Sequence, residues 1–227
     1  MLPIIYQDEH LIAINKPHGL LVHRSKIAND ATEFALQLLR DQIGQHVSPV
    51  HRIDRKTGGL LLFAFEKDVE IAMQKQFQEG LVHKKYLAIV RGYTPDQLDI
   101  DYPLVKDNGT LQDAFTSFLT LQRAEINVPH GKHATSRYSL VEATPTTGRM
   151  HQLRKHFAHI FHPIIGDRKH GCNKQNKFFT EKFDMSTMLL HASALKFNHP
   201  ITGQSISMEA PVQDEFKRML QLMEIII

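Results

Sequence analysis

Cysteine is almost absent from this sequence, since Cys172 is the only one among 227 residues. A single thiol excludes an internal disulfide and any metal site built on several thiolates, and it is typical of a reducing compartment. Apolar runs are also short, and none approaches the roughly 18 residues that a membrane-spanning helix needs. The opening MLPIIYQDEH has no basic stretch ahead of its acids, so no signal peptide is expected. The sequence therefore predicts a soluble, cytoplasmic protein with no membrane partner.

The motifs that hold common cofactors are missing too. There is no glycine-rich phosphate loop, no dinucleotide fingerprint and no serine in a nucleophile elbow. Histidines are plentiful, but His151 and His156 are five residues apart, and His159 and His162 are three apart. Helical zinc pairs are spaced four apart with a third ligand nearby. We therefore expect neither a cofactor nor a metal ion.

What the chain does have is enough apolar residues for a core and a mild excess of positive charge. Hydrophobic residues make up 42% of it, and the formal net charge is +3. A chain of this composition folds into a packed domain and is not disordered. The basic balance favours a polyanionic partner only weakly, because many basic proteins never bind nucleic acid.

Hydrophobic periodicity predicts interspersed strands and helices. A helix over residues 30–44 has Asp30 and Glu33 in a capping-box pattern and Gly44 at its end. Residues 94–133 are the least patterned and are expected to hold one excursion or hairpin. Strands are expected within 11–16, 20–23, 59–65, 84–92, 135–143, 189–197 and 205–210, and further helices within 66–80, 150–160 and 213–223.

These elements do not follow the regular alternation of a doubly wound sheet. The order predicts an α+β fold with a mixed, largely antiparallel sheet and flanking helices. No internal repeat, low-complexity segment or linker interrupts the chain, so residues 1–227 are expected to form a single catalytic domain.

Asp54 stands out in the stretch HRIDRKTGGLLLF, where it is the only acid among three bases. One interpretation is a turn residue that hydrogen-bonds local backbone amides. The other is a functional carboxylate, because guanidinium groups nearby keep an aspartate ionised and therefore usable as a nucleophile or base. Gly58 and Gly59 would allow a sharp bend and the close approach of a ligand.

A second stretch is dense in positive charge. From Arg149 to Lys177 there are seven lysines and arginines and five histidines against one acid, Asp167. Such a segment can be a solvated face, but its density favours a surface that contacts phosphates. Arg149 and Arg154 are five residues apart, so on a helix they cannot both point at one ligand. The residues expected to contact a nucleic acid here are Arg149, His151, Gln152, Arg168 and Lys169.

Four stretches resemble, in order along the chain, the motifs of RluA-type pseudouridine synthases. They are HRIDRKTGG, KKYLAIVRG, GRMHQLRKHFAHIFHPIIGD and LLHASAL. The family's aspartate motif usually has a leucine where this chain has Ile53 and a serine where it has Gly58. The similarity extends from Ile4 to about Pro211. It implies a pseudouridine synthase fold without the accessory N-terminal RNA-binding domain of some relatives.

The resemblance implies a role for each matching residue. Asp54 matches the catalytic aspartate, which attacks either the uracil ring or the ribose anomeric carbon. Arg154 matches the basic residue that pairs with it, and Tyr86 matches the tyrosine that stacks on the target base; on its own, a tyrosine in a strand is more often a packing residue. Arg52 matches the arginine that fills the gap left by the flipped nucleotide, and Leu190 an apolar residue against the base.

The reaction implied by the family is a redox-neutral isomerisation that needs no cofactor. It cleaves the N1–C1′ bond of uridine, rotates the base and rejoins it through C5. Within the family, the segments RDQIGQH, SRYSLVE and HPIIGDRKHG look most like members that modify tRNA near the junction of acceptor and T stems, at position 65. The expected partner is therefore tRNA, and no protein partner is implied. The charged clusters around Arg52, Lys84 and Arg168 are expected to rim a single cleft.

Three alternatives remain open at this point. Ribosomal RNA could be the substrate, since single-domain relatives that modify it exist. A catalytically idle RNA-binding module would keep the basic surface, although it would have no use for Asp54, Tyr86 and Arg154. An aspartate-dependent glycosidase would need a second carboxylate facing the same sugar.

Overall fold

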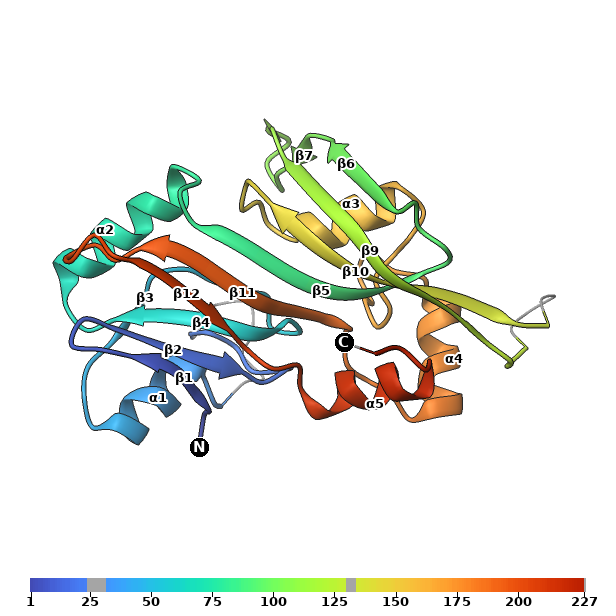
Figure 1. Cartoon of the computed structure of the whole chain (residues 1–227), viewed down its shortest axis with the longest axis horizontal. Coiled ribbons are helices and arrows are strands. Elements are labelled where there is room, and N and C mark those ends of the chain that lie inside the picture. Colours follow the sequence, from blue (N-terminus) through green and yellow to red (C-terminus); the bar gives the residue numbers. More distant parts are fainter. Residues whose placement is uncertain (24–31, 130–133, 227) are drawn as a thin grey trace. The chain divides into compact units, whose positions relative to one another are not determined.

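The computed structural model of this protein describes residues 1–23, 32–129 and 134–226 (Figure 1). In that part of the chain, twelve strands and five helices form two compact units. The first unit comprises residues 1–84 and 192–212, and the second residues 85–191 and 213–227. The boundary falls inside the strands β5 (His83–Arg91) and β11 (Leu190–Asn198), so each strand contributes residues to both units.

The first unit is built on antiparallel strand pairs. β2 (Leu11–Lys16) pairs with β1 (Ile4–Gln7) on one side and with β4 (Gly58–Ala64) on the other. β3 (Ser48–Pro49) also pairs with β4, and β12 (Ser205–Glu209) pairs with β11. All seven residues of β4 are buried, which agrees with its continuous apolar run.

Two helices belong to this first unit, α1 (Ala35–Ile43) and α2 (Lys67–Gln78). Alternate residues of β2 and β4, among them Ile14 and Phe63, form one core cluster with Ala35 and Leu39 of α1. α1 therefore covers one face of these strands.

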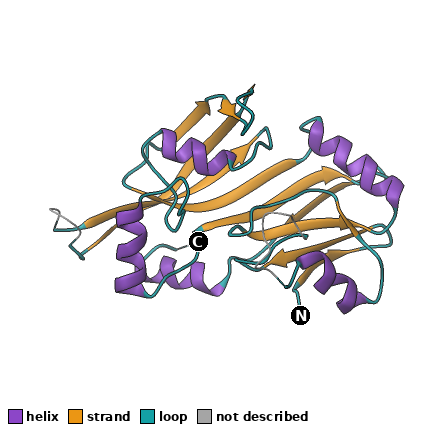
Figure 2. Cartoon of the chain, turned by 180° about the vertical axis from the view of Figure 1, so that it is seen from behind, coloured by secondary structure: helices purple, strands orange, loops and turns teal. Residues whose placement is uncertain are grey.

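The second unit has its own antiparallel sheet, in the order β5, β10 (Ser136–Pro145), β9 (Phe115–Ile126) and β6 (Gln97–Asp101). A separate two-stranded hairpin joins β7 (Leu104–Val105) to β8 (Leu111–Gln112). Figure 2 shows this chain from behind, with helices and strands in separate colours.

The helices of this second unit are α3 (Gln152–His159), α4 (Asn173–Phe183) and α5 (Asp214–Leu222). Leu153 and Phe157 of α3 join Val90 of β5, Phe118 of β9 and Val141 of β10 in one buried cluster. The helix that holds Arg154 is thus fixed on the sheet by its apolar face.

Most predicted elements are confirmed, and so is the α+β class with a largely antiparallel sheet and flanking helices. The prediction of one catalytic domain over residues 1–227 stays a prediction. Residues 20–23 do not form the expected strand, because only Leu21 makes an isolated bridge, to Phe34. No helix of the described residues is long and apolar enough to cross a membrane.

The first helix begins later than predicted, at Ala35. Its N-cap is Phe34, which makes no side-chain capping bond, so the capping box was wrong, and Asp30 itself lies outside the described residues. The predicted end at Gly44 is confirmed, because Gly44 has φ of 66° and its N–H donates to the Arg40 carbonyl.

Candidate functional site

Asp54 lies in the first unit on a short loop that leads into β4. The N–H of Thr57 donates to the Asp54 carbonyl at 3.0 Å, which closes a turn over residues 54–57. Arg52 is exposed, Ile53 is buried and Asp54 is half-buried. This alternation places Arg52 and Asp54 on the outer side of the loop and uses Ile53 as its anchor, as an extended segment before the aspartate predicts.

Lys16 lies beneath this loop and is fully buried. Its ammonium donates to three carbonyl oxygens, those of Pro17 at 2.9 Å, Leu20 at 2.8 Å and Arg55 at 3.2 Å. Burial lowers the pKa of Lys16 to about 7, and the negative charge of Asp54 opposes that shift. The lysine therefore ties two loops together and places a positive charge within electrostatic range of Asp54.

The Asp54 loop is also tied to residues 18–19. The Gly19 N–H donates to the Arg55 carbonyl at 2.9 Å, and the Arg55 Nε donates back to the Gly19 carbonyl at 3.0 Å. His18 Nδ1 lies 2.8 Å from the carbonyl oxygen of Lys56. Because these bonds and those of Lys16 converge on residues 55–56, the segment after Asp54 is held on both sides.

His51 anchors the other end of the loop. Its Nε2 accepts a hydrogen bond from the Leu62 N–H at 3.0 Å, and its ring stacks on Phe77 with centroids 4.6 Å apart. Burial, assisted by the charge of Lys84, lowers the pKa of His51 to about 3, so the ring is neutral at pH 7. Lys84 is itself only 7% exposed. The arrangement of the clusters around Arg52, Lys84 and Arg168 along a single cleft stays a prediction.

Of the two glycines after the loop, Gly59 has the constrained backbone. Its φ is 106°, and a Cβ atom there would lie 2.2 Å from the Ala192 carbonyl oxygen. At Gly59, the close approach that the sequence predicts is therefore made by the backbone of β11. Gly59 lets β4 and β11 pack together directly behind the Asp54 loop.

In the second unit, Arg154 forms a buried, bidentate ion pair with Asp167. The Arg154 Nε and Nη2 each donate to a different oxygen of the carboxylate at 2.8 Å. Asp167 also accepts from the N–H groups of Lys169 at 2.9 Å and His170 at 3.1 Å. Burial acts to raise the pKa of Asp167, but the bonds from Arg154 and these N–H groups outweigh it and lower the pKa.

Asp167 is a functional candidate that the sequence pattern did not single out. It was noticed only as the one acid of the basic segment, thirteen residues from Arg154. Its position in the turn after HPIIG brings it back to α3, and there it fixes the orientation of the guanidinium. The pairing of Arg154 with Asp54 stays a prediction.

His151 and His170 form a pair beside this ion pair. His151 Nδ1 lies 2.9 Å from His170 Nε2, and the rings meet edge to face. His151 is the N-cap of α3 with φ of 57°, an uncommon left-handed conformation for a side chain of this size. Burial is the main reason that the pKa of His170 is lowered to about 4.

Gln152 is buried, and both the nitrogen and the oxygen of its side-chain amide form hydrogen bonds within the protein. Its Nε2 donates to the Phe115 carbonyl and to Thr116 Oγ1, while its Oε1 accepts from the Thr147 hydroxyl and the Arg149 N–H. It therefore fixes the turn that carries Arg149, whose own Nε donates to the Asp113 carbonyl at 2.9 Å. Arg149 and Arg154 thus have different partners, as their spacing predicts.

Tyr86 and Leu190 lie in the same region of the second unit. Leu190 is buried in the core cluster of α3 and the sheet, and Tyr86 is half-buried against that cluster. A partly exposed ring on an apolar floor is suited to stacking on a planar ligand. By contrast, Arg168 and Lys169 are exposed in the turn after Asp167.

Within the described residues, no group of three or more histidine, cysteine, aspartate or glutamate side chains is arranged to hold a metal ion. The site residues are therefore distributed between the Asp54 loop of the first unit and the α3 region of the second.

Residues 10–159 of this chain match the family model described as RNA pseudouridylate synthase. Named relatives are similar over nearly their whole length. The tRNA pseudouridine synthase C of Haemophilus ducreyi is 47% identical, with 96% of this chain and 94% of the relative covered. The enzymes of the same name from Pasteurella multocida and Vibrio cholerae are 45% and 44% identical, with 98% and 97% of this chain and 96% and 95% of those relatives covered.

Solved structures with this fold include two human proteins. Human RNA Pseudouridylate Synthase Domain Containing 4 has a TM-score of 0.75 at 25% identity, covering 99% of this chain and 94% of that one. Human RNA Pseudouridylate Synthase Domain Containing 1 has a TM-score of 0.75 at 20% identity, covering 99% and 95%. These likenesses agree with the fold described above.

Proposed function

The chain belongs to the RNA pseudouridylate synthase family, and on that premise we propose that it converts a uridine of tRNA, near the junction of the acceptor and T stems, to pseudouridine. The observation that carries the choice of tRNA is the near-full-length similarity to relatives named tRNA pseudouridine synthase C. The enzyme is thus a pseudouridine synthase, which is an isomerase. What we propose beyond this is that its substrate is tRNA and that the modified uridine lies near the stem junction.

We propose that Asp54 is the nucleophile. It lies at the outer side of a loop held by carbonyl bonds to a buried lysine, and such anchoring keeps a reacting group in one geometry. The target base must leave its stack, at a cost of a few kcal/mol. Arg52, exposed two residues before Asp54, would occupy the vacated space.

The second unit would hold the base and the backbone. Tyr86 stacks on the extruded uracil and Leu190 packs under it, while Arg154, oriented by Asp167, supports the charge of Asp54. Arg149, Arg168, Lys169 and His151 would contact phosphates or riboses. Gln152 would act through Arg149, because it fixes the turn on which that arginine lies.

The test is turnover on unmodified transcripts. Purified protein is incubated with a set of tRNA transcripts and with large-subunit rRNA, and pseudouridine is mapped at single-nucleotide resolution. We expect one modified uridine near the acceptor and T stem junction of tRNA, and no product with Asp54→Asn. Efficient product in rRNA and none in any tRNA would overturn the substrate while leaving the reaction class intact. RNA binding without product in either would favour the idle binding module.

A further inference from the structure

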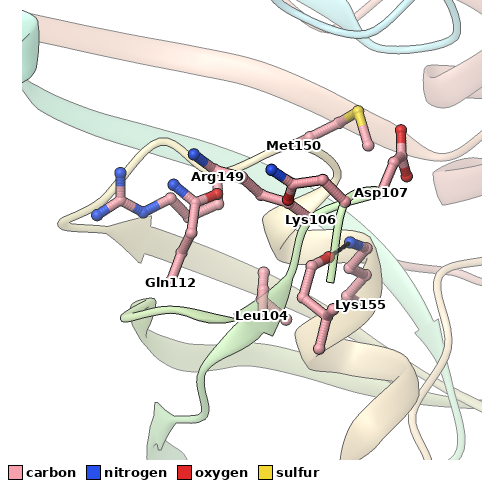
Figure 3. Close-up of a pocket in the computed structure, with 9 residues that line it drawn as sticks. Leu104, Lys106, Asp107, Gln112, Arg149, Met150 and Lys155 are labelled. Carbon is pink, nitrogen blue, oxygen red and sulfur yellow. Dashed lines mark hydrogen bonds between the residues drawn. The ribbon is translucent and has the colours of Figure 1, made fainter. Parts of the chain in front are cut away.

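A pocket of about 400 Å³ lies in the second unit beside the start of α3 (Figure 3). The β7–β8 hairpin, with residues of 104–112, supplies one wall, and Arg149, Met150 and Lys155 supply the other. None of the hairpin residues belongs to the site proposed above. A volume of this size can hold one nucleotide-sized group.

Hydrogen bonds hold the two walls in place without a ligand. In the hairpin, the Lys106 N–H donates to the Thr110 carbonyl and the Gly109 N–H donates to the Lys106 carbonyl, both at 2.9 Å. Lys155 Nζ donates across the pocket to the Val105 carbonyl at 3.3 Å (Figure 3). The pocket is therefore built into the folded chain, and a ligand would find it largely formed.

The lining carries an excess of positive charge. Lys106, Arg149 and Lys155 contribute three cations against one carboxylate, that of Asp107. Among the described residues, none of the three cations pairs with a carboxylate, and the terminal nitrogens of Arg149 make no hydrogen bond. These groups are available to a phosphate, which Arg and Lys bind as charged donors.

Apolar surface completes the pocket. Val105 is 52% exposed and Met150 48%, and both line it together with the buried Leu104. A mixed lining of cations and apolar side chains matches a nucleotide, because the phosphate can lie on the cations and the sugar or base on the apolar wall. A simple inorganic anion would contact only the cations and leave the apolar wall uncovered.

We propose that this pocket is an RNA subsite that binds the phosphodiester and sugar of a nucleotide other than the target uridine. The proposal rests on the proposed function, since it assumes that RNA is the substrate. Arg149 belongs to both sites, because the turn that carries it leads directly into the helix with Arg154. The hairpin is thereby a further element that selects the RNA.

The test compares two double variants that lose the same charge. Lys106→Gln with Lys155→Gln removes two pocket cations, and Lys182→Gln with Lys196→Gln removes two exposed cations elsewhere. Affinity for the transcript is measured from 50 to 200 mM salt. We expect the slope of log K against log salt to fall by about 1.5 to 2 for the pocket variant, as for two lost phosphate contacts. The control variant should keep the wild-type slope.

A second pair tests the apolar wall. Val105→Glu adds a carboxylate to the pocket, and Leu98→Glu adds one to another partly exposed strand position of the same unit. Val105→Glu should raise KM for tRNA several-fold while kcat at saturation stays at the wild-type value, and Leu98→Glu should change neither.

Equal salt slopes for both double variants would overturn the subsite even if the enzyme modifies tRNA. If wild type modifies neither tRNA nor rRNA, the proposed function fails, and the salt slopes still decide whether the pocket binds RNA.

Discussion

The two units bury positive charge in different ways. In the first, the buried ammonium of Lys16 donates to three backbone carbonyls beneath the Asp54 loop, and the negative charge of Asp54 acts on it. In the second, Arg154 is neutralised by the two oxygens of Asp167. The first arrangement leaves a base whose pKa is lowered to about 7, whereas the second lowers the pKa of Asp167 and so stabilises its charged form.

This difference assigns different tasks to the two units. A buried lysine that donates to the carbonyls of two loops holds those loops together and presents its charge to a neighbouring carboxylate. A bidentate ion pair fixes the direction of a guanidinium and makes it insensitive to pH near neutrality. The proposed nucleophile thus lies on a segment held by hydrogen bonds to the backbone, and its proposed partner on a helix held by a side-chain ion pair.

The largest expected effect is that of Asp54→Asn. It preserves shape but removes the carboxylate, so product should fall below detection, by at least about a thousandfold, while RNA affinity changes only a few-fold. Single-turnover assays on the transcript and filter binding measure the two quantities. Asp41→Asn, an exposed position in the same unit, is the control. Turnover above a trace in Asp54→Asn would remove it from the role of nucleophile.

Breaking the ion pair should have the next largest effect. Asp167→Ala leaves a buried, uncompensated guanidinium, which typically costs about 3–5 kcal/mol in the free energy of unfolding. The double variant Arg154→Leu with Asp167→Leu should cost less than either single change, because no unpaired charge remains. Urea titration measures stability, and Asp99→Asn is an exposed control in the same unit. If Asp167→Ala were as stable as the control, the ion pair would not contribute to the free energy of unfolding.

Activity separates positioning from stability in these variants. Asp167→Asn keeps a hydrogen-bonding side chain, and we expect it to recover most of the stability that Ala loses but to keep a lowered kcat. A purely structural Asp167 would recover both together.

Sequence patterns predicted the helices that bury a single face and the strands that are buried throughout. β4 is a continuous apolar run, and α2 buries Val69 and Met73 at helical spacing, so both follow from periodicity. β9 was missed, because Leu119 and Leu121 are about half exposed and blur its alternation of apolar and polar residues. α4 was missed because its first five residues were interpreted only as the end of the basic segment that stops at Lys177, and the rest was not assigned to any element.

For the site, the Asp54 loop could be found from its motif, but the residues that support it could not. Lys16 ends an apolar strand and is followed by proline, a pattern that gives no sign of burial. The contact between Arg154 and Asp167 depends on a turn that reverses the chain after α3, so no helical spacing reveals it. Gly59 could be recognised as special, but its cause, the backbone of Ala192, is 133 positions away in the chain and invisible to local patterns.

A smaller effect should follow from Lys16→Met, and it should depend on pH. In the wild type, burial lowers the folded-state pKa of Lys16 to about 7 from its ordinary value of 10.5. Between these values the unfolded chain binds more protons, so the wild type should gain stability as pH rises, by at most about 1.4 kcal/mol per pH unit. The variant should lack this gain. Denaturant midpoints at pH 7 and 9 measure it, and parallel curves for the two proteins would contradict it.

The smallest expected effect tests whether each carboxylate acts on the base beside it. Asp54 raises the pKa of Lys16 against the effect of burial, and Asp167 does the same for His170. Asp54→Asn should therefore lower the pKa of Lys16 below about 7, and Asp167→Asn should lower that of His170 below about 4. NMR titration of the lysine ammonium and the imidazole measures both, with Asp41→Asn and Asp99→Asn as controls. If Asp54→Asn leaves Lys16 unchanged, the lysine only ties the loops together, and the electrostatic support proposed for the nucleophile must come from elsewhere.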